Sequence, residues 1–151
     1  MKVIFLDIDG VFCTLRSHFA YAKKGGLMCH FDPTCCRLIK KLLELHNAKI
    51  VVSSVWRYDH HKVELFAKLK KHNLFQFLHE DWRTSDLFNK IRGEEVKEWL
   101  SRHPEVEKYI IIDDDSDFLE EQKPFFIKTN GREGFGAENF QLFEKLMEIK
   151  L

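Results

Sequence analysis

The chain has 151 residues with 24 basic and 24 acidic side chains, so its formal net charge is zero, and 44% of its residues are hydrophobic. This length corresponds to one domain, and the composition argues against a disordered chain or a uniformly basic nucleic-acid-binding protein. No apolar run approaches the roughly 20 residues that span a bilayer, and the N-terminus lacks the apolar stretch of a signal peptide. We therefore expect a single cytoplasmic domain over residues 1–151 that has no membrane partner.

The apolar pattern predicts an alternation of strands and helices. In chain order, the expected elements are a strand at 3–6, an irregular flap or small hairpin at 11–31, a helix at 33–47, a strand at 49–52, a helix at 60–72, a short strand at 74–78, a helix at 93–103, strands at 109–112 and 125–128, and a helix at 137–149. Asp32 is placed at the N-cap of the first helix, and Leu45 and Val63 on the inner faces of the first two helices. Such alternation implies an α/β fold: a three-layer, Rossmann-like parallel sheet with helices on both faces.

Polar side chains directly follow three of the apolar strands. They are Asp7 and Asp9, Ser53 and Ser54, and Asp113 and Asp114. Ligands of open α/β sheets bind beyond the carboxyl ends of the strands. The three polar clusters are therefore expected to converge on one edge of the sheet.

Carboxylates at one sheet edge need a cation, because like charges raise each other's pKa. Oxygen ligands favour Mg²⁺ or Ca²⁺ over zinc, and Mg²⁺ commonly also binds a substrate phosphate. A free aspartate can attack phosphorus, and a second can protonate the leaving oxygen. An EF-hand loop is excluded, since the twelfth position counted from Asp7 is His18 and from Asp113 is Pro124. The residues thus favour phosphoryl-transfer chemistry.

Three motifs resemble those of the haloacid dehalogenase (HAD) superfamily. In order, they are Phe5-Leu6-Asp7-Ile8-Asp9-Gly10-Val11, Val51-Val52-Ser53-Ser54 and Ile111-Ile112-Asp113-Asp114. The finer pattern is similar to the HAD domains of RNA-repair proteins and their free-standing bacterial relatives; it comprises Ser53-Ser54-Val55-Trp56-Arg57, Arg92-Gly93-Glu94-Glu95-Val96 and Asp113-Asp114-Asp115. The resemblance implies a HAD-like hydrolase domain.

The resemblance also implies roles for the strand-end residues. Asp7 would be the nucleophile and Asp9 the general acid/base, and an acid at the second position implies a phosphatase or phosphotransferase. Ser53 would bind the transferred phosphoryl group, or Ser54 if the strand ends one residue later. Mg²⁺ would be held by Asp7, the backbone carbonyl of Asp9 and Asp113, with Asp114 acting directly or through water.

The lysine motif of the superfamily is the least defined in this chain. Lys90 is the expected phosphate-binding lysine, because it lies just before the helix that leads to the Asp113 strand. Arg92 and Lys97 remain open as alternatives. The gaps between the motifs are too short for a large cap, so the resemblance implies a capless member whose only insertion is the flap at 11–31.

The expected function is that of a Mg²⁺-dependent phosphatase acting through an aspartyl-phosphate, on a phosphomonoester at a nucleic-acid end or on a nucleotide. Two alternatives stay open: a phosphatase of small phosphometabolites, and a non-catalytic, regulatory phosphate-binding domain. The flap favours an extended anionic substrate, because basic and aromatic side chains are interleaved in it. These side chains are Arg16, Lys23, Lys24, Phe19 and Tyr21.

The four cysteines form no C-x-x-C pair. They are Cys13, Cys29, Cys35 and Cys36. In a chain of this length without a secretion signal, they are expected to be reduced thiols.

Overall fold

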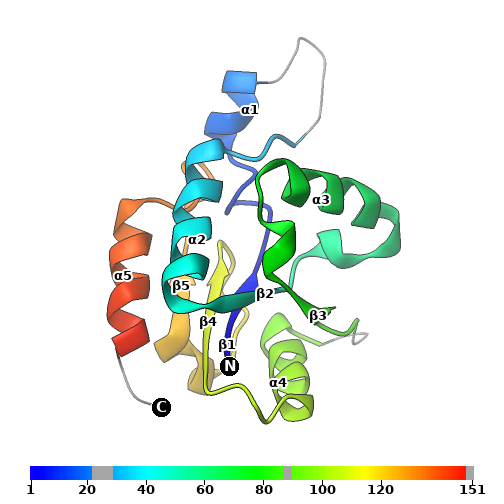
Figure 1. Cartoon of the computed structure of the whole chain (residues 1–151), viewed down its shortest axis with the longest axis vertical. Helices are drawn as coiled ribbons and strands as arrows, with labels where there is room; N and C mark the ends of the chain where they lie inside the picture. The colour runs from blue at the N-terminus through cyan, green and yellow to red at the C-terminus, as the bar shows by residue number, and fades with distance from the viewer. Residues whose placement is uncertain (22–28, 87–89, 149–151) are drawn as a thin grey trace.

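The computed structural model describes residues 1–21, 29–86 and 90–148 (Figure 1). Five parallel strands form one sheet in the order β3-β2-β1-β4-β5; they are β1 (Lys2–Leu6), β2 (Ala48–Val52), β3 (Leu78–Arg83), β4 (Lys108–Asp113) and β5 (Phe126–Lys128). The helices are α1 (Leu15–Tyr21), α2 (Pro33–His46), α3 (Asp59–Lys71), α4 (Arg92–Arg102) and α5 (Ala137–Glu148). None of the helices in these ranges is long and apolar enough to cross a membrane.

Helices cover both faces of the sheet. Alternate side chains of each strand point to opposite faces, and the apolar side chains on each face pack against helices. Ile4 and Leu6 of β1 belong to a core cluster that includes apolar residues of α2, α3 and α5. Val3 and Phe5 belong to a second cluster with residues of α4. The Phe5 ring meets the Trp99 ring of α4 edge-on, with centroids 5.3 Å apart. This arrangement confirms the predicted three-layer, Rossmann-like architecture.

The strand register brings the polar strand ends together. Leu6, the last residue of β1, pairs with Val52 of β2 on one side and with Ile112 of β4 on the other. The residues that follow these three positions are Asp7, Ser53 and Asp113. The chain continues from β1 to β2 on one side and reaches β4 on the other, so these residues lie at the switch point of the sheet.

The described part of the flap contains a helix, α1, where an irregular segment or a hairpin was expected. Its start is fixed by reciprocal hydrogen bonds: the Thr14 backbone N–H donates to Ser17 Oγ, and the Ser17 backbone N–H donates to Thr14 Oγ1, both at 3.0 Å. These bonds resemble a capping box, but Ser17 stands where the usual sequence signature has Glu or Gln, so the sequence did not indicate this helix start. Lys23 and Lys24 lie outside the described residues.

The expected strand at 74–78 was also misplaced. Phe75–Phe77 form a short 3₁₀ helix, and β3 begins only at Leu78. Leu74 is buried, and Phe75 and Phe77 pack against the core cluster, so their apolar character comes from packing outside the sheet. β3 itself is an edge strand with only partly buried or exposed side chains, and its sequence therefore lacks a buried-strand signature.

Two inner-face assignments were wrong. Asp32 caps α2 as predicted, with its Oδ1 accepting from the Thr34 backbone N–H at 2.8 Å, but Leu45 is 54% exposed. Val63 of α3 is 82% exposed, and Leu65 and Leu69 occupy the buried face instead. Residues two positions apart in a helix face different directions, so Val63 cannot share the face of Leu65.

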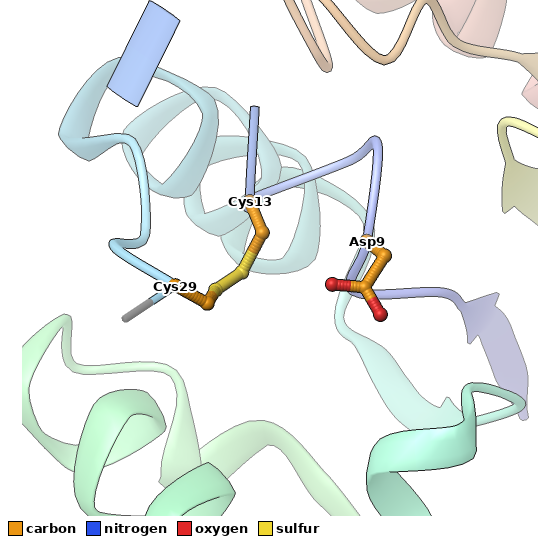
Figure 2. Close-up of side chains that lie close together, drawn as sticks. All are labelled: Asp9, Cys13 and Cys29. Atoms are coloured by element: carbon orange, nitrogen blue, oxygen red, sulfur yellow. A yellow bond between two sulfur atoms is a disulfide. The ribbon is translucent and has the colours of Figure 1, made fainter. Parts of the chain in front are cut away.

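Cys13 and Cys29 are joined by a disulfide across the base of the flap, with Cα atoms 5.6 Å apart (Figure 2). The expectation of four reduced thiols is therefore wrong for this pair and holds for Cys35 and Cys36, which are free and buried. The two paired residues are 16 positions apart and meet only because the flap returns to its starting point. Sequence spacing without a C-x-x-C motif could not predict this pairing.

Candidate active site

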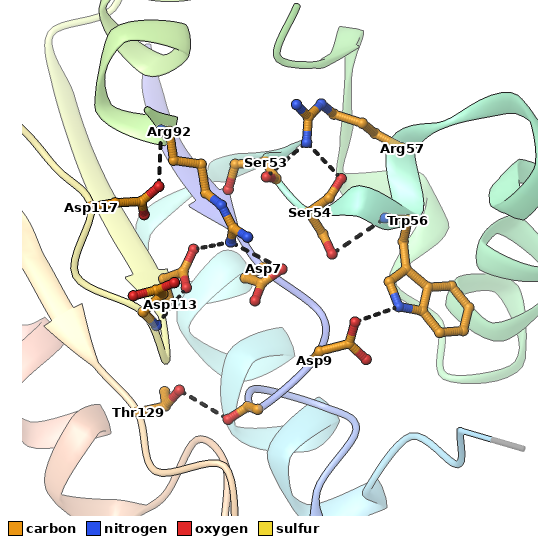
Figure 3. Close-up of polar contacts among 12 residues, drawn as sticks. Asp7, Asp9, Ser53, Ser54, Trp56, Arg57, Arg92, Asp113, Asp117 and Thr129 are labelled. Carbon is orange, nitrogen blue, oxygen red and sulfur yellow. Dashed lines mark hydrogen bonds and ion pairs between the residues drawn. The ribbon is translucent and has the colours of Figure 1, made fainter. Parts of the chain in front are cut away.

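Asp7 and Asp113 lie side by side at the carboxyl edge of the sheet (Figure 3). The Asp7 backbone N–H donates to the Ile112 carbonyl at 3.0 Å, which continues the β1–β4 ladder by one residue. Asp7 is 4% exposed and Asp113 is fully buried. Together with Asp114, they offer three carboxylate oxygens that lie within 4.8 Å of one another.

Burial and the neighbouring charge of Asp7 make Asp113 and Asp114 resist ionisation. Desolvation and then the charge of Asp7 raise the pKa of Asp113 to about 7, although Arg92 opposes the shift. Desolvation and the same charge also raise the pKa of Asp114. Clustered carboxyl groups of this kind are stabilised by a bound cation, which favours their charged forms.

Arg92 supplies positive charge to the cluster. Its Nη1 lies 2.5 Å from Asp113 Oδ2 and 3.4 Å from Asp7 Oδ1. Burial disfavours the charged guanidinium, but the charges of Asp7 and Asp113 outweigh it and raise the pKa of Arg92. The guanidinium therefore stays charged at the edge of the sheet.

The start of α4 fixes the position of Arg92. Asp117, in the loop after β4, accepts a hydrogen bond from the Arg92 backbone N–H at 3.2 Å, and its carbonyl accepts from the Gly93 N–H at 3.1 Å. A Cβ at Gly93 would lie 2.6 Å from the backbone nitrogen of Leu119. Glycine at this position thus allows α4 to approach the loop closely enough for Arg92 to reach the carboxylates.

Ser53 and Ser54 are both fully buried but differ in their contacts. The Ser54 hydroxyl caps the short 3₁₀ helix Val55–Arg57 by accepting from the Trp56 backbone N–H at 3.4 Å. The Ser53 Oγ finds no hydrogen-bond partner among the residues that the structure describes. An unpaired buried hydroxyl is costly, so Ser53 is the one available to a ligand.

Asp9 lies two residues beyond Asp7 and accepts a hydrogen bond from the indole of Trp56, with Nε1 3.0 Å from Asp9 Oδ2 (Figure 3). Partial desolvation of the carboxyl group raises its pKa; the Trp56 bond lowers it and the charge of Asp7 raises it further. A carboxyl group with a raised pKa is suited to donate a proton near neutral pH.

Gly10 allows the turn after β1 to pass close to Asp114. Its φ is +73°, and a Cβ there would overlap the carboxyl group of Asp114. The Gly10 carbonyl also accepts from Thr129 Oγ1 at 2.9 Å, which fastens the turn to the loop after β5. A residue with a side chain would be strained in this backbone conformation, and its Cβ would not fit beside Asp114.

A buried ion pair supports the end of β2. Arg57 Nη2 lies 2.9 Å from both carboxylate oxygens of Glu95 of α4, and the two side chains are only 4% and 6% exposed. Arg57 Nη1 also donates to the carbonyls of Ser53 at 3.1 Å and Ser54 at 2.9 Å. The pair thus links α4 to the backbone that presents the Ser53 hydroxyl.

A family model described as the HAD domain in Swiss Army Knife RNA repair proteins matches residues 3–140. The chain belongs to this family of HAD domains. A comparison with curated proteins finds no match. Membership supports a HAD-type, phosphatase-like activity in general terms.

The structure of this HAD domain brings most of the predicted site residues together. Among the basic candidates, it places Arg92 at the carboxylates, where Lys90 was expected. Lys90 is exposed and forms no hydrogen bond or ion pair with a described residue. Lys97 pairs with Glu121 at the surface, with a 3.0 Å contact. Only Arg92, which was kept as an alternative, reaches the carboxylates.

Two residues of the site were missed as such. Trp56 and Arg57 follow Ser53-Ser54 after one residue, Val55, and the sequence favours packing plus a salt bridge for them over a catalytic role. The ion pair between Arg57 and Glu95 confirms the salt bridge. In the HAD domain, Trp56 contacts the Asp9 carboxyl group and Arg57 holds two carbonyls of the β2 end. Their place one residue after the second motif was the available signal for their proximity to the site.

The carboxylates of Asp7, Asp113 and Asp114 fit a Mg²⁺ ion. Their donor set consists of oxygens alone, and Mg²⁺ prefers oxygen ligands over the nitrogen and sulfur ligands of zinc. Burial and the charge of Asp7 raise the pKa values of Asp113 and Asp114, and a cation bound between the carboxylates would favour their charged forms. The side chain of Asp9 points to Trp56 instead, which is compatible with the expected contribution of its backbone carbonyl.

Proposed function

We propose that this HAD domain is a Mg²⁺-dependent phosphatase that forms an aspartyl-phosphate on Asp7. The observation that carries the proposal is the placement of the buried Asp7 carboxylate beside Asp113 and Asp114, with the unpaired hydroxyl of Ser53 following the neighbouring strand. Three carboxylates can hold a hard cation, and the hydroxyl can donate to a phosphoryl oxygen.

The residues have separate roles in the proposed reaction. An Asp7 carboxylate oxygen bonds to phosphorus as the ester bond breaks, and Asp9 gives its proton to the leaving oxygen. Asp9 then accepts a proton from a water molecule that attacks phosphorus, which releases inorganic phosphate and restores Asp7. Ser53 and Arg92 bind oxygens of the transferred group. Asp7, Asp113 and Asp114 would hold Mg²⁺, which would neutralise negative charge on the transferred phosphoryl group.

The proposed substrate is a phosphomonoester at a nucleic-acid end. The family to which the chain belongs is named for RNA repair proteins, which supports this choice. Between β1 and α2, the described residues contain only the short helix α1, so a polymer end could approach the sheet edge without displacing a cap. A small phosphometabolite is the competing substrate.

The first test is turnover of a chromogenic phosphate ester and of oligonucleotides phosphorylated at the 3′ or 5′ end. We expect hydrolysis with Mg²⁺, loss of hydrolysis with a chelator, and recovery when Mg²⁺ is restored. Hydrolysis that persists in the chelator would exclude the metal role. Binding of phosphate without turnover of any ester would favour a non-catalytic, regulatory domain.

Asp9→Asn is expected to impair poor leaving groups more than good ones. An alkyl phosphate needs a proton on its leaving oxygen, whereas nitrophenolate leaves with little assistance. Rapid-quench measurement of the phosphorylation step should therefore show a loss of about a hundredfold or more for the alkyl ester and a much smaller loss for the nitrophenyl ester. Equal losses for the two esters would remove Asp9 from the role of general acid.

Trp56→Phe is expected to lower kcat by about tenfold, because it deletes the donor to the Asp9 carboxyl group while keeping an aromatic ring. The Trp56 hydrogen bond lowers the Asp9 pKa, so its removal raises that pKa. The limb of the pH–rate profile that reports Asp9 should move to higher pH. Trp82→Phe, which removes an indole in contact with Phe66, is the control. An unchanged profile in Trp56→Phe would contradict this positioning role.

A further inference from the structure

A cavity of about 320 Å³ lies between the flap and α3. Its lining consists of Tyr21, His30, Phe31, Pro33, Lys68, Lys71 and His72. Four of these residues carry aromatic rings, two carry an ammonium group, and none is acidic. This combination of aromatic surface and positive charge matches a nucleotide, which offers a base that stacks and a phosphate that is negatively charged.

The rings of the cavity are arranged in pairs. Phe31 and His72 are stacked, with centroids 5.9 Å apart and an interplanar angle of 24°. The ring of Tyr21 lies 6.3 Å from that of His30. Phe31 is 5% exposed, whereas Tyr21 is 52% exposed, so Tyr21 has ring surface free for a base.

The charged groups of the cavity also differ in availability. Lys68 Nζ donates to the Cys29 carbonyl at 2.5 Å and lies 3.3 Å from Glu64, so it is already paired. Lys71 is exposed and forms no ion pair with any residue in the described ranges. Lys71 is therefore the ammonium group free to bind a phosphate.

A short series of contacts connects the cavity to the catalytic edge. Trp56 donates to Asp9 and lies 6.3 Å, centroid to centroid, from the Phe31 ring that lines the cavity. The backbone of Phe31 also forms a bridge with Cys13 at the base of the flap. A chain whose terminal phosphate reaches Asp7 could place a neighbouring nucleotide in the cavity.

Arg16, expected to contact a phosphate backbone, does not belong to this surface. Its Nε lies 2.9 Å from Asp32 Oδ2, and its Nη1 lies 2.6 Å from Glu133 Oε2. The guanidinium fastens α1 to the body of the domain and is already neutralised. Tyr21, also expected in substrate binding, remains available at the cavity.

We propose that this cavity, which we call the base pocket, binds one nucleotide of a single-stranded nucleic acid whose phosphorylated end reaches Asp7. A base stacks on Tyr21, and Lys71 binds a backbone phosphate. The proposal rests on the proposed phosphatase function, since it gives that site its substrate class. It also predicts that the protein binds an oligonucleotide that lacks a terminal phosphate and cannot be hydrolysed.

The test measures binding of a short fluorescent oligonucleotide without a terminal phosphate, by anisotropy, in RNA and DNA forms. Tyr21→Ala and Lys71→Ala are the pocket variants. Phe19→Ala is the matched control for the ring, because Phe19 is 79% exposed on the same helix outside the pocket. Lys70→Ala is the control for charge, because Lys70 adjoins Lys71 but contacts the Phe75 ring.

We expect each pocket variant to raise Kd about fivefold or more, and the controls to leave it within about twofold. Lys71→Ala should also reduce the dependence of log Kd on log salt by about 0.7, the loss of one phosphate contact. Turnover of a small chromogenic ester should stay at the wild-type rate in both pocket variants. A preference for RNA over DNA would identify contacts to the ribose 2′-hydroxyl.

Equal Kd values in pocket and control variants, or no oligonucleotide binding by the wild-type protein, would overturn the base pocket. Failure of the phosphatase proposal gives a different result. A protein that hydrolyses no phosphomonoester, but loses oligonucleotide binding in Tyr21→Ala and Lys71→Ala, would keep the pocket and lose the proposed reaction.

Discussion

Replacing Asp7 by asparagine is expected to reduce phosphatase turnover to background, a loss of about a thousandfold or more. The amide cannot attack phosphorus, and the change removes one of the three carboxylates placed to hold Mg²⁺. The fold should persist, because asparagine has nearly the same size and removes a negative charge that repels Asp113. Steady-state kinetics and thermal unfolding measure the two effects separately.

Asp115→Asn is the matched control for that variant. Asp115 follows Asp113-Asp114 directly and is exposed, and only its backbone N–H contacts Asp113, at 2.8 Å. The substitution keeps all three carboxylates of the cluster and removes a charge that affects the Asp114 pKa less than the charge of Asp7 does, so activity should remain close to wild type. Full activity in Asp7→Asn would contradict the proposed nucleophile.

Glu95→Ala is expected to lower the free energy of unfolding by about 3–5 kcal/mol, because it leaves the Arg57 charge buried and unpaired. Domains of this size are stable by only about 5–15 kcal/mol, so denaturant unfolding should detect the loss easily. Glu121→Ala, which breaks the exposed pair with Lys97, should change stability little. A Glu95→Ala protein as stable as wild type would show that the buried pair makes no net contribution to the free energy of unfolding.

The same pair can be tested for a role in positioning. Arg57→Met combined with Glu95→Leu replaces both charges with apolar groups and should recover much of the lost stability. The carbonyls of Ser53 and Ser54 would still lack their donors. We therefore expect kcat to remain low in the stable double variant, and recovery of both properties would assign the pair a purely structural role.

The catalytic edge could be predicted from the sequence because strand ends are encoded locally. Each of the buried strands β1, β2 and β4 contains an uninterrupted apolar run, at Val3–Leu6, Ile50–Val52 and Tyr109–Ile112. The first polar residue after each run marks the sheet edge. Parallel pairing then places Asp7, Ser53 and Asp113 in adjacent positions without knowledge of any side-chain contact. The position of these three residues is thus a property of pattern and topology alone.

Other features depend on contacts between distant segments. Whether Lys90 or Arg92 reaches the carboxylates is decided by where α4 starts, and Asp117 in a later loop fixes that start. The Trp56–Asp9 hydrogen bond likewise joins residues 47 positions apart. Residue type and spacing do not specify these long-range contacts. The choice between Lys90 and Arg92 therefore stayed open, and the Trp56–Asp9 contact was missed although Trp56 lies close behind the second motif.

The most direct test is chemical trapping of the proposed intermediate. The Asp9→Asn variant is mixed with a nitrophenyl phosphate and Mg²⁺, quenched, and treated with borohydride, which reduces an acyl phosphate to an alcohol. Mass spectrometry of the N-terminal peptide should show homoserine in place of Asp7, and none when the chelator is present from the start. An unmodified Asp7 during active turnover, or reduction only at another aspartate, would contradict an aspartyl-phosphate mechanism at Asp7.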